Sequence, residues 1–187
     1  MRTVPELIAY AKESPGKINV ASGGNGSIQH IYLELLKMLT GANLVHVPYR
    51  GGGPALTDLL GGHAQAMFDT ATTCIEHIRA ARLCPLAVTT ATRLEVLPDV
   101  PSMSEFVPGF EGSGWQGIGA PKNTPTDIID KLNREISAGL SDSKIKTRFT
   151  EWASLPFVLS PDDFGKHIAD ETEKWAKVIR TANIKPD

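Results

Sequence analysis

Two glycine-rich segments hold the residues of this chain that could bind a small anion. Residues 22–27 read Ser-Gly-Gly-Asn-Gly-Ser, and residues 49–53 read Tyr-Arg-Gly-Gly-Gly. Each segment follows a short apolar run and precedes a stretch with helical apolar spacing, which is the order of strand, turn and helix start. Such a turn directs unpaired backbone N–H groups and the positive end of a helix dipole toward one point. The pattern predicts an anion receptor at the carboxyl edge of a parallel sheet, without catalytic side chains.

The candidate ligand residues come from these two turns and from the end of the next apolar run. Glycines permit close approach and positive φ, and serine hydroxyls add donors, although a plain turn with Ser27 as a helix cap is the alternative interpretation. For Asp69 three roles stay open: accepting from a ligand hydroxyl, holding a bridging water, or capping the turn before Thr70. The Arg50 side chain could form a bidentate ion pair with a carboxylate, but a solvent-facing side chain is the favoured interpretation. The predicted ligand residues are Ser22, Gly24, Asn25, Gly26, Ser27, Tyr49, Gly51, Gly52, Asp69 and Thr70.

An enzyme is the less favoured interpretation of the same residues. Ser27, His30 or His46, and Asp69 could be drawn as a catalytic triad. No Gly-x-Ser-x-Gly elbow surrounds any serine, and His46 falls in the middle of a predicted strand. The sequence therefore favours binding without catalysis.

Cofactors and metals find little support in the sequence. Gln29 stands where the third glycine of a dinucleotide fingerprint belongs, and no P-loop lysine follows. The five histidines are scattered, and Cys74 and Cys84 are too few for a disulfide framework. We expect no cofactor and no metal, and two unpaired, mostly buried thiols.

Composition and charge fit an ordinary globular protein. Hydrophobic residues make up 41% of the 187 residues and charged residues 21%. The net charge of −2 argues against a nucleic-acid partner, because phosphate binding usually needs a basic face. No apolar run reaches the length of a membrane span, and the first residues lack the apolar core of a signal peptide.

Strands and helices alternate in the first half, which predicts an α/β fold with a parallel sheet covered on both faces. Predicted helices occupy residues 4–13, 27–39, 55–60 and 73–81, and predicted strands occupy 18–21, 44–47, 64–69 and 85–89. Helices dominate after a loop at 92–108, which contains a short helix at 102–106. Residues 112–120 are predicted as a strand or hinge, 124–140, 142–151 and 160–183 as helices, and 155–159 as a strand. Thr124 and Ser160 are the expected caps.

Several motifs together resemble one family. They are residues 21–27, 46–60, 66–69 (Ala-Met-Phe-Asp) and 85–90, followed in order by Arg93, 98–101 (Pro-Asp-Val-Pro), 104–105 and 114–115. This set resembles the Bug (TctC-like) family of extracytoplasmic solute receptors of tripartite tricarboxylate transporters. The resemblance covers essentially the whole chain and implies a type II periplasmic-binding-protein-like fold.

The resemblance also implies how the chain is organised. Members are two-lobed, and this sequence begins where lobe two begins, so we expect a truncated chain. Residues 1–112 then form lobe two, and 113–187 form the carboxyl-terminal return into an incomplete lobe one. Apolar stripes on the helices at 124–140 and 160–183 would lack their usual cover, and we expect a second copy or a rearranged segment to bury them.

The implied function is capture of a small carboxylate, a di- or tricarboxylate or an aromatic acid, in the periplasm. The implied partners are the membrane subunits of the transporter. The alternative is a truncated homologue that serves as a protein-interaction or dimerisation module without a transport role.

Overall fold

The computed structural model describes residues 1–185. The chain divides into two units. Unit 1 consists of Met1–Gly114 together with the chain from Lys177 onward, and unit 2 consists of Trp115–Ala176.

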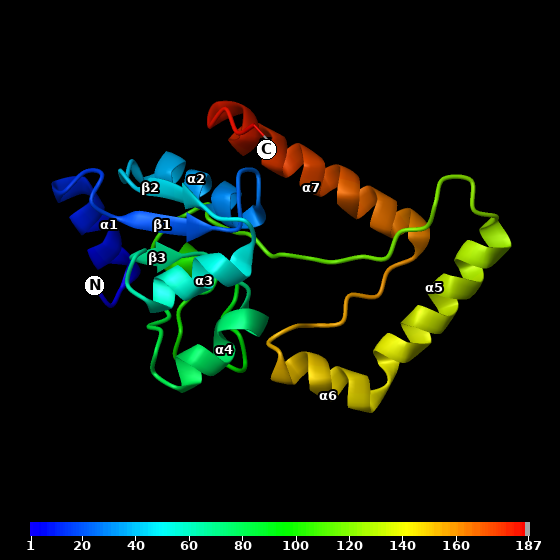
Figure 1. The fold of residues 1–187 in the computed structure, drawn as a ribbon. Helices are drawn as coiled ribbons and strands as arrows, with labels where there is room; N and C mark the ends of the chain where they lie inside the picture. The colour runs from blue at the N-terminus through cyan, green and yellow to red at the C-terminus, as the bar shows by residue number, and fades with distance from the viewer. Residues whose placement is uncertain (186–187) are drawn as a thin grey trace. The chain divides into compact units, whose positions relative to one another are not determined.

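Unit 1 contains a three-stranded parallel sheet. Its strands are β1 (Asn19–Ser22), β2 (Val45–Pro48) and β3 (Ala66–Met67), in the order β2-β1-β3 (Figure 1). Val20 in the central strand is paired with both His46 and Ala66. The connection from β1 through α2 to β2 and the connection from β2 through α3 to β3 run in opposite directions across the sheet. Because such connections are right-handed, α2 and α3 lie on opposite faces of the sheet. The last three residues of β1 are accordingly all buried.

Four α-helices and one 3₁₀ turn accompany this sheet. They are α1 (Val4–Glu13), α2 (Ile28–Thr40), α3 (Gly52–Leu60), α4 (Ala71–Arg79) and η1 (Met103–Glu105). Their ends follow local chemistry. Thr3 caps α1 by accepting from the Glu6 amide, Ser27 caps α2, and Gly41 ends α2 with a left-handed φ of 69°.

The core of unit 1 lies between the sheet and these helices. Leu33 and Leu36 of α2 and Ile18 before β1 are each at most 1% exposed. In the same unit, Phe110 stacks on Phe68 and meets Tyr32 edge-on. α2 therefore buries Ile31, Tyr32, Leu33 and Leu36, whereas its apolar residues Ile28 and Leu39 are exposed.

Unit 2 is helical and much more open. It contains α5 (Thr126–Ser141), α6 (Ser143–Glu151) and the larger part of α7 (Pro161–Thr181), which continues into unit 1. Neither α5 nor α6 contains a buried residue. We call the exposed apolar side chains on and after these helices the open stripe. Its members are Ile128, Leu132, Ile145, Trp152, Leu155, Phe157, Val158 and Ile168.

The α/β class and the parallel sheet are confirmed, but two predicted strands are wrong. Residues 85–89 make only one isolated bridge, between Val88 and Ser102. The Val88 amide and carbonyl bond Pro101 and Met103, so this segment pairs with a proline-containing loop rather than with the sheet. Residues 155–159 are not a strand, and no described strand pairs with them.

Several smaller differences separate the structure from the sequence predictions. The strand predicted at 64–69 is limited to Ala66–Met67, because it pairs on one side only and its last residues turn toward α4. Residues 112–120 form neither a strand nor a helix, so the strand alternative is wrong and the hinge alternative stays a prediction. Thr124 does not cap α5, since its hydroxyl donates to the Pro121 carbonyl. Cys84 is exposed rather than buried.

Candidate functional site

Three helix starts share one edge of the sheet in unit 1. Because the strands are parallel, their carboxyl ends lie at the same edge. From that edge the chain passes through residues 22–27 into α2, through 49–51 into α3, and through 68–70 into α4. Three helix amino ends with positive dipole character therefore gather where anions are bound in open α/β sheets.

The two glycine-rich turns lie in direct contact. The Gly51 amide donates to the Gly23 carbonyl at 3.0 Å, and the Tyr49 amide donates to the Ser22 carbonyl at 2.9 Å. A Cβ atom added to Gly23 would lie 3.3 Å from the Gly52 nitrogen and closer still to the Gln29 side chain. Close approach of the two backbones thus requires glycine at position 23.

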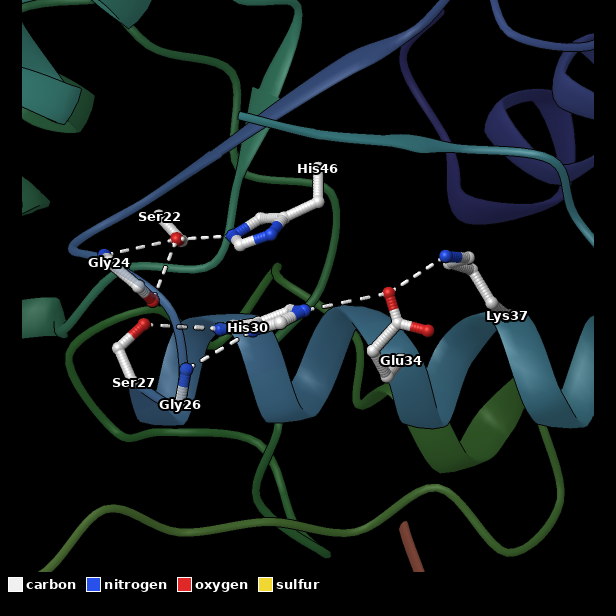
Figure 2. Close-up of polar contacts among 8 residues, drawn as sticks. All are labelled: Ser22, Gly24, Gly26, Ser27, His30, Glu34, Lys37 and His46. Carbon is white, nitrogen blue, oxygen red and sulfur yellow. Dashed lines mark hydrogen bonds and ion pairs between the residues drawn. The ribbon is translucent and has the colours of Figure 1, made fainter. Parts of the chain in front are cut away.

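The first turn uses most of its own amide hydrogens. Gly23 donates to the Gln29 side chain. Gly24 donates to the Ser22 hydroxyl at 3.2 Å, and Gly26 donates to Nδ1 of His30 at 3.2 Å (Figure 2). The Ser27 amide bonds the Gly24 carbonyl. The amides of Gly24 and Gly26 thus already donate to side chains of unit 1, and contact of these two residues with a ligand stays a prediction.

Other amides at the same edge are still available as donors. Gly52 and Gly53 begin α3, and their amides have no acceptor among the described residues. The same holds for the first two helical amides of α2 and of α4, which belong to Ile28, Gln29, Ala71 and Thr72. These first-turn amides are the orphan donors that every helix leaves at its start. These amides are the groups that could donate hydrogen bonds to a carboxylate ligand at this edge.

The predicted serines act within the protein. Ser22 is 1% exposed, and its hydroxyl lies 2.6 Å from Nε2 of His46 and 3.2 Å from the Gly24 carbonyl. Ser27 accepts from the His30 backbone amide at 3.4 Å, as an N-cap of α2. Asn25 is exposed beside them in the same turn. Ser22 and Ser27 thus shape the turn in this structure.

Tyr49 and Arg50 differ in their surroundings. The Tyr49 ring packs against the small buried cluster Ala21, Ala55 and Ala64, and its hydroxyl donates to Asp58 at 2.8 Å. That hydrogen bond, aided by burial, raises the pKa of Tyr49. Arg50 is exposed, in agreement with the favoured interpretation. Tyr49 therefore anchors α3 to the sheet.

Asp69 connects the turn before α4 to α2. Its carboxylate accepts from the Thr70 amide at 2.9 Å, from the Thr73 hydroxyl at 2.7 Å and from Nε2 of Gln29 at 3.3 Å. Burial raises the pKa of Asp69, and the hydrogen bonds from Thr73, Thr70 and Gln29 oppose that rise. Of the three open roles, the structure shows the cap before Thr70.

Gln29 is the residue that sequence reasoning missed. Its side chain accepts from the Gly23 amide and donates to Asp69, so it ties the first turn to the start of α4. The position of Gln29 in the sequence could have indicated this role. A glutamine side chain two residues after the N-cap is long enough to reach back to the turn that precedes the helix.

The hypothetical triad is not assembled. The Ser27 hydroxyl caps α2, and Asp69 binds Gln29, Thr70 and Thr73 rather than a histidine. His30 instead stacks on His46, with ring centroids 3.7 Å apart. Within residues 1–185 no group of three or more His, Cys, Asp or Glu side chains is arranged to hold a metal ion. No helix in the described part of the chain is long and apolar enough to cross a membrane.

Comparison with known proteins defines the class. Residues 1–184 match the family described as the tripartite tricarboxylate transporter family receptor. Protein BugT of Bordetella pertussis is 38% identical over 180 residues, which cover 96% of this chain and 55% of BugT. This chain belongs to that receptor family, whose members are solute-binding proteins rather than enzymes.

Solved structures agree over the whole fold. An R. palustris protein with adipate matches with a TM-score of 0.94 and 35% identity, over 100% of this chain and 63% of that one. The periplasmic binding protein BugD matches with a TM-score of 0.87 and 32% identity, over 100% and 64%. MatC from Rhodopseudomonas palustris with bound malate matches with a TM-score of 0.82 and 30% identity, over 95% and 62%. The chain therefore spans about half to two thirds of the length of these relatives.

Proposed function

We propose that this chain binds a small dicarboxylate at the carboxyl edge of its sheet, as part of a periplasmic receptor that serves a tripartite tricarboxylate transporter. The observation that carries the proposal is the pair of acceptor-free amides at Gly52 and Gly53, beside a turn with fixed geometry. The ligands of related structures support the same class, since adipate and malate both carry two carboxylates.

We also propose that residues 1–112 correspond to lobe two of such a receptor and residues 113–187 to the return into lobe one. The open stripe supports this division, because its apolar residues lack the cover that a complete lobe would provide.

In the proposed complex, one carboxylate lies against the first turn of α3 and accepts from the Gly52 and Gly53 amides. The first-turn amides of α2 and α4 face the same edge and complete the set of donors, together with the helix dipoles. The residues predicted from the sequence, with Gly53 added, line the same edge, and we propose that the ligand lies among them. Ser22, Ser27, Tyr49 and Asp69 contribute by holding the three turns in place.

One pair of substitutions at Gly52 isolates the amide hydrogen. Gly52 is the first helical residue and does not have a positive φ, whereas the preceding Gly51 has a φ of 107° and a ψ of 165°. Proline is favoured at this position and deletes the N–H, whereas Gly52→Ala keeps the N–H and adds a Cβ that meets only Gln29 at 3.7 Å.

We expect calorimetric titration with adipate and with malate to detect binding of at least one of them to the natural chain. A hydrogen bond to a charged group contributes roughly 1.5–3 kcal/mol, so Gly52→Pro should weaken that binding about 10- to 100-fold. Gly52→Ala should leave it within about a factor of two. Absence of binding by both acids, or equal affinity in the two variants, would contradict the proposal.

A second candidate function, a dimerisation module, rests on the open stripe. Leu155 is 79% exposed and Phe157 56% exposed, which is costly in water at about 25 cal/mol per Å² of apolar surface. We propose that a second copy covers the stripe. Light scattering should then show a dimer that Leu132→Asp dissociates, whereas Leu39→Asp, at a helical site of similar exposure in unit 1, should leave it intact. A monomeric natural chain would exclude this candidate.

A further inference from the structure

Two histidine rings stack directly behind the first glycine-rich turn. His30 projects from α2 and His46 from β2, with ring centroids 3.7 Å apart and an interplanar angle of 11° (Figure 2). His30 is 9% exposed. The proposed carboxylate contacts do not involve either ring, so the pair needs a separate explanation.

Each ring contacts the turn. Nδ1 of His30 accepts from the Gly26 amide at 3.2 Å, and Nε2 of His46 lies 2.6 Å from the Ser22 hydroxyl. That hydroxyl also accepts from the Gly24 amide at 3.2 Å. The pair therefore supports the turn at both of its ends, through Ser22 and through Gly26.

The bond from Gly26 determines the protonation state of His30. A backbone N–H can donate only to a ring nitrogen with a free lone pair, so Nδ1 carries no hydrogen. The hydrogen of the neutral ring is then on Nε2, which lies 3.7 Å from the Glu34 carboxylate. A second proton on His30 would have to occupy Nδ1, where it would oppose the Gly26 N–H and replace an attraction with a repulsion.

The charges around His30 are few. On its own helix they are Glu34 and Lys37, which bond each other at 2.7 Å. The group facing it from β2 is His46, whose ring in turn contacts the uncharged Ser22 of β1. Burial lowers the pKa of His30 below 6.5, Glu34 partly opposes this, and Lys37 adds to it.

The sign of the resulting pH dependence follows from this lowered pKa. Between the folded-state pKa and 6.5 the unfolded chain binds more protons than the folded chain. The stabilisation from neutral His30 is therefore complete above pH 6.5 and declines as the pH falls through the folded-state pKa.

We propose that His30, stacked on His46, is a positioning residue that holds the first glycine-rich turn only while its ring is neutral, so that acidification releases the turn. The proposal deepens the proposed function, and it rests on that function only for its effect on ligand affinity. Its direct consequence is a local change at Gly26.

The natural chain can test that consequence by NMR between pH 5 and pH 8. We expect the Gly26 amide resonance to shift with the same midpoint as the His30 ring, below pH 6.5. In His30→Asn the side-chain oxygen can replace Nδ1 as an acceptor but cannot be charged, so the Gly26 transition should vanish. His63→Asn, the same change at an exposed histidine of unit 1, should leave the transition intact. A Gly26 signal that ignores the His30 titration, or that still shifts in His30→Asn, would overturn the proposal.

Adipate titrations extend the test to binding. If only the neutral form is competent, affinity falls about tenfold for each pH unit below the His30 midpoint. Ionisation of adipate affects the natural chain and His30→Asn alike, so the ratio of their affinities isolates the protein's contribution. Equal pH dependence in both chains would overturn the effect on affinity. No binding at any pH would contradict the proposed function instead, and the Gly26 resonance would still decide the role of His30.

Discussion

The two glycine-rich turns of unit 1 differ in what their amide hydrogens bind. In the first turn, Gly23, Gly24 and Gly26 donate to side chains of Gln29, Ser22 and His30. In the second, Gly51 donates to the first turn, whereas Gly52 and Gly53 have no acceptor among residues 1–185. One turn is fixed by its neighbours and the other still offers donors, so similar glycine content serves two different purposes. The first turn is the support, and the second is the proposed binding surface.

The largest effect expected from this comparison is at Gln29. Gln29→Ala should lower the free energy of unfolding by about 1–3 kcal/mol, because it leaves the part-buried Gly23 amide without an acceptor and removes one of the donors to Asp69. Urea unfolding followed by far-UV circular dichroism measures the change.

Gln65→Ala is the matched control. Gln65 also accepts from a backbone amide, that of Asn19 at 3.0 Å, but in an exposed setting where water can replace it. Its loss should change the free energy of unfolding by less than about 0.5 kcal/mol. Equal losses in the two variants would mean that Gln29 does not support the first turn more than an ordinary surface contact.

Alanine substitutions in the two turns should have smaller effects on stability, and these effects should be opposite in sign. Gly26 has a φ of 73°, where an L-residue costs about 1–2 kcal/mol, so Gly26→Ala should destabilise the protein by that amount. Gly53 is a helical residue with open space around its would-be Cβ, so Gly53→Ala should stabilise it by about 0.4–1 kcal/mol. Thermal unfolding of both variants and of the natural chain measures these changes in stability. Changes of the same sign would contradict the proposed difference between the two turns.

The smallest effect concerns Asp69, which Gln29 joins to the first turn. Because burial raises its pKa above 3.8, the folded chain binds more protons than the unfolded chain just above that pH. The contribution of Asp69 to stability therefore falls as the pH rises from 3.8 through its folded-state pKa. Asp69→Asn should lack this decline, so the difference in unfolding free energy between variant and natural chain should change between pH 4 and pH 7. A constant difference would show that Asp69 is not perturbed.

Much of this arrangement could be predicted from the sequence, because it depends on neighbouring residues. The Ser27 cap, the αL glycine at position 41 and the strand–turn–helix order of both glycine segments are local signals, and the structure contains all of them. Parallel pairing then brings both turns to one edge without further information.

The rest depended on contacts between distant parts of the chain. Which amides of the first turn are free was not predictable, since the acceptors are side chains whose directions are fixed only in the fold, as with Gln29 and His30. The strand predicted at 155–159 failed for a related reason. Its apolar composition fits a strand, but strand structure requires a neighbour, and the described chain offers none there.

The division into two units also separates the aromatic chromophores. All three tryptophans, at positions 115, 152 and 175, belong to unit 2, whereas the three tyrosines, at 10, 32 and 49, belong to unit 1. Fluorescence excited at the red edge of the tryptophan absorption band therefore reports on unit 2 alone. The sheet of unit 1 does not contribute to that signal. Denaturation curves from indole emission and from peptide ellipticity should coincide only if both units melt as one cooperative block.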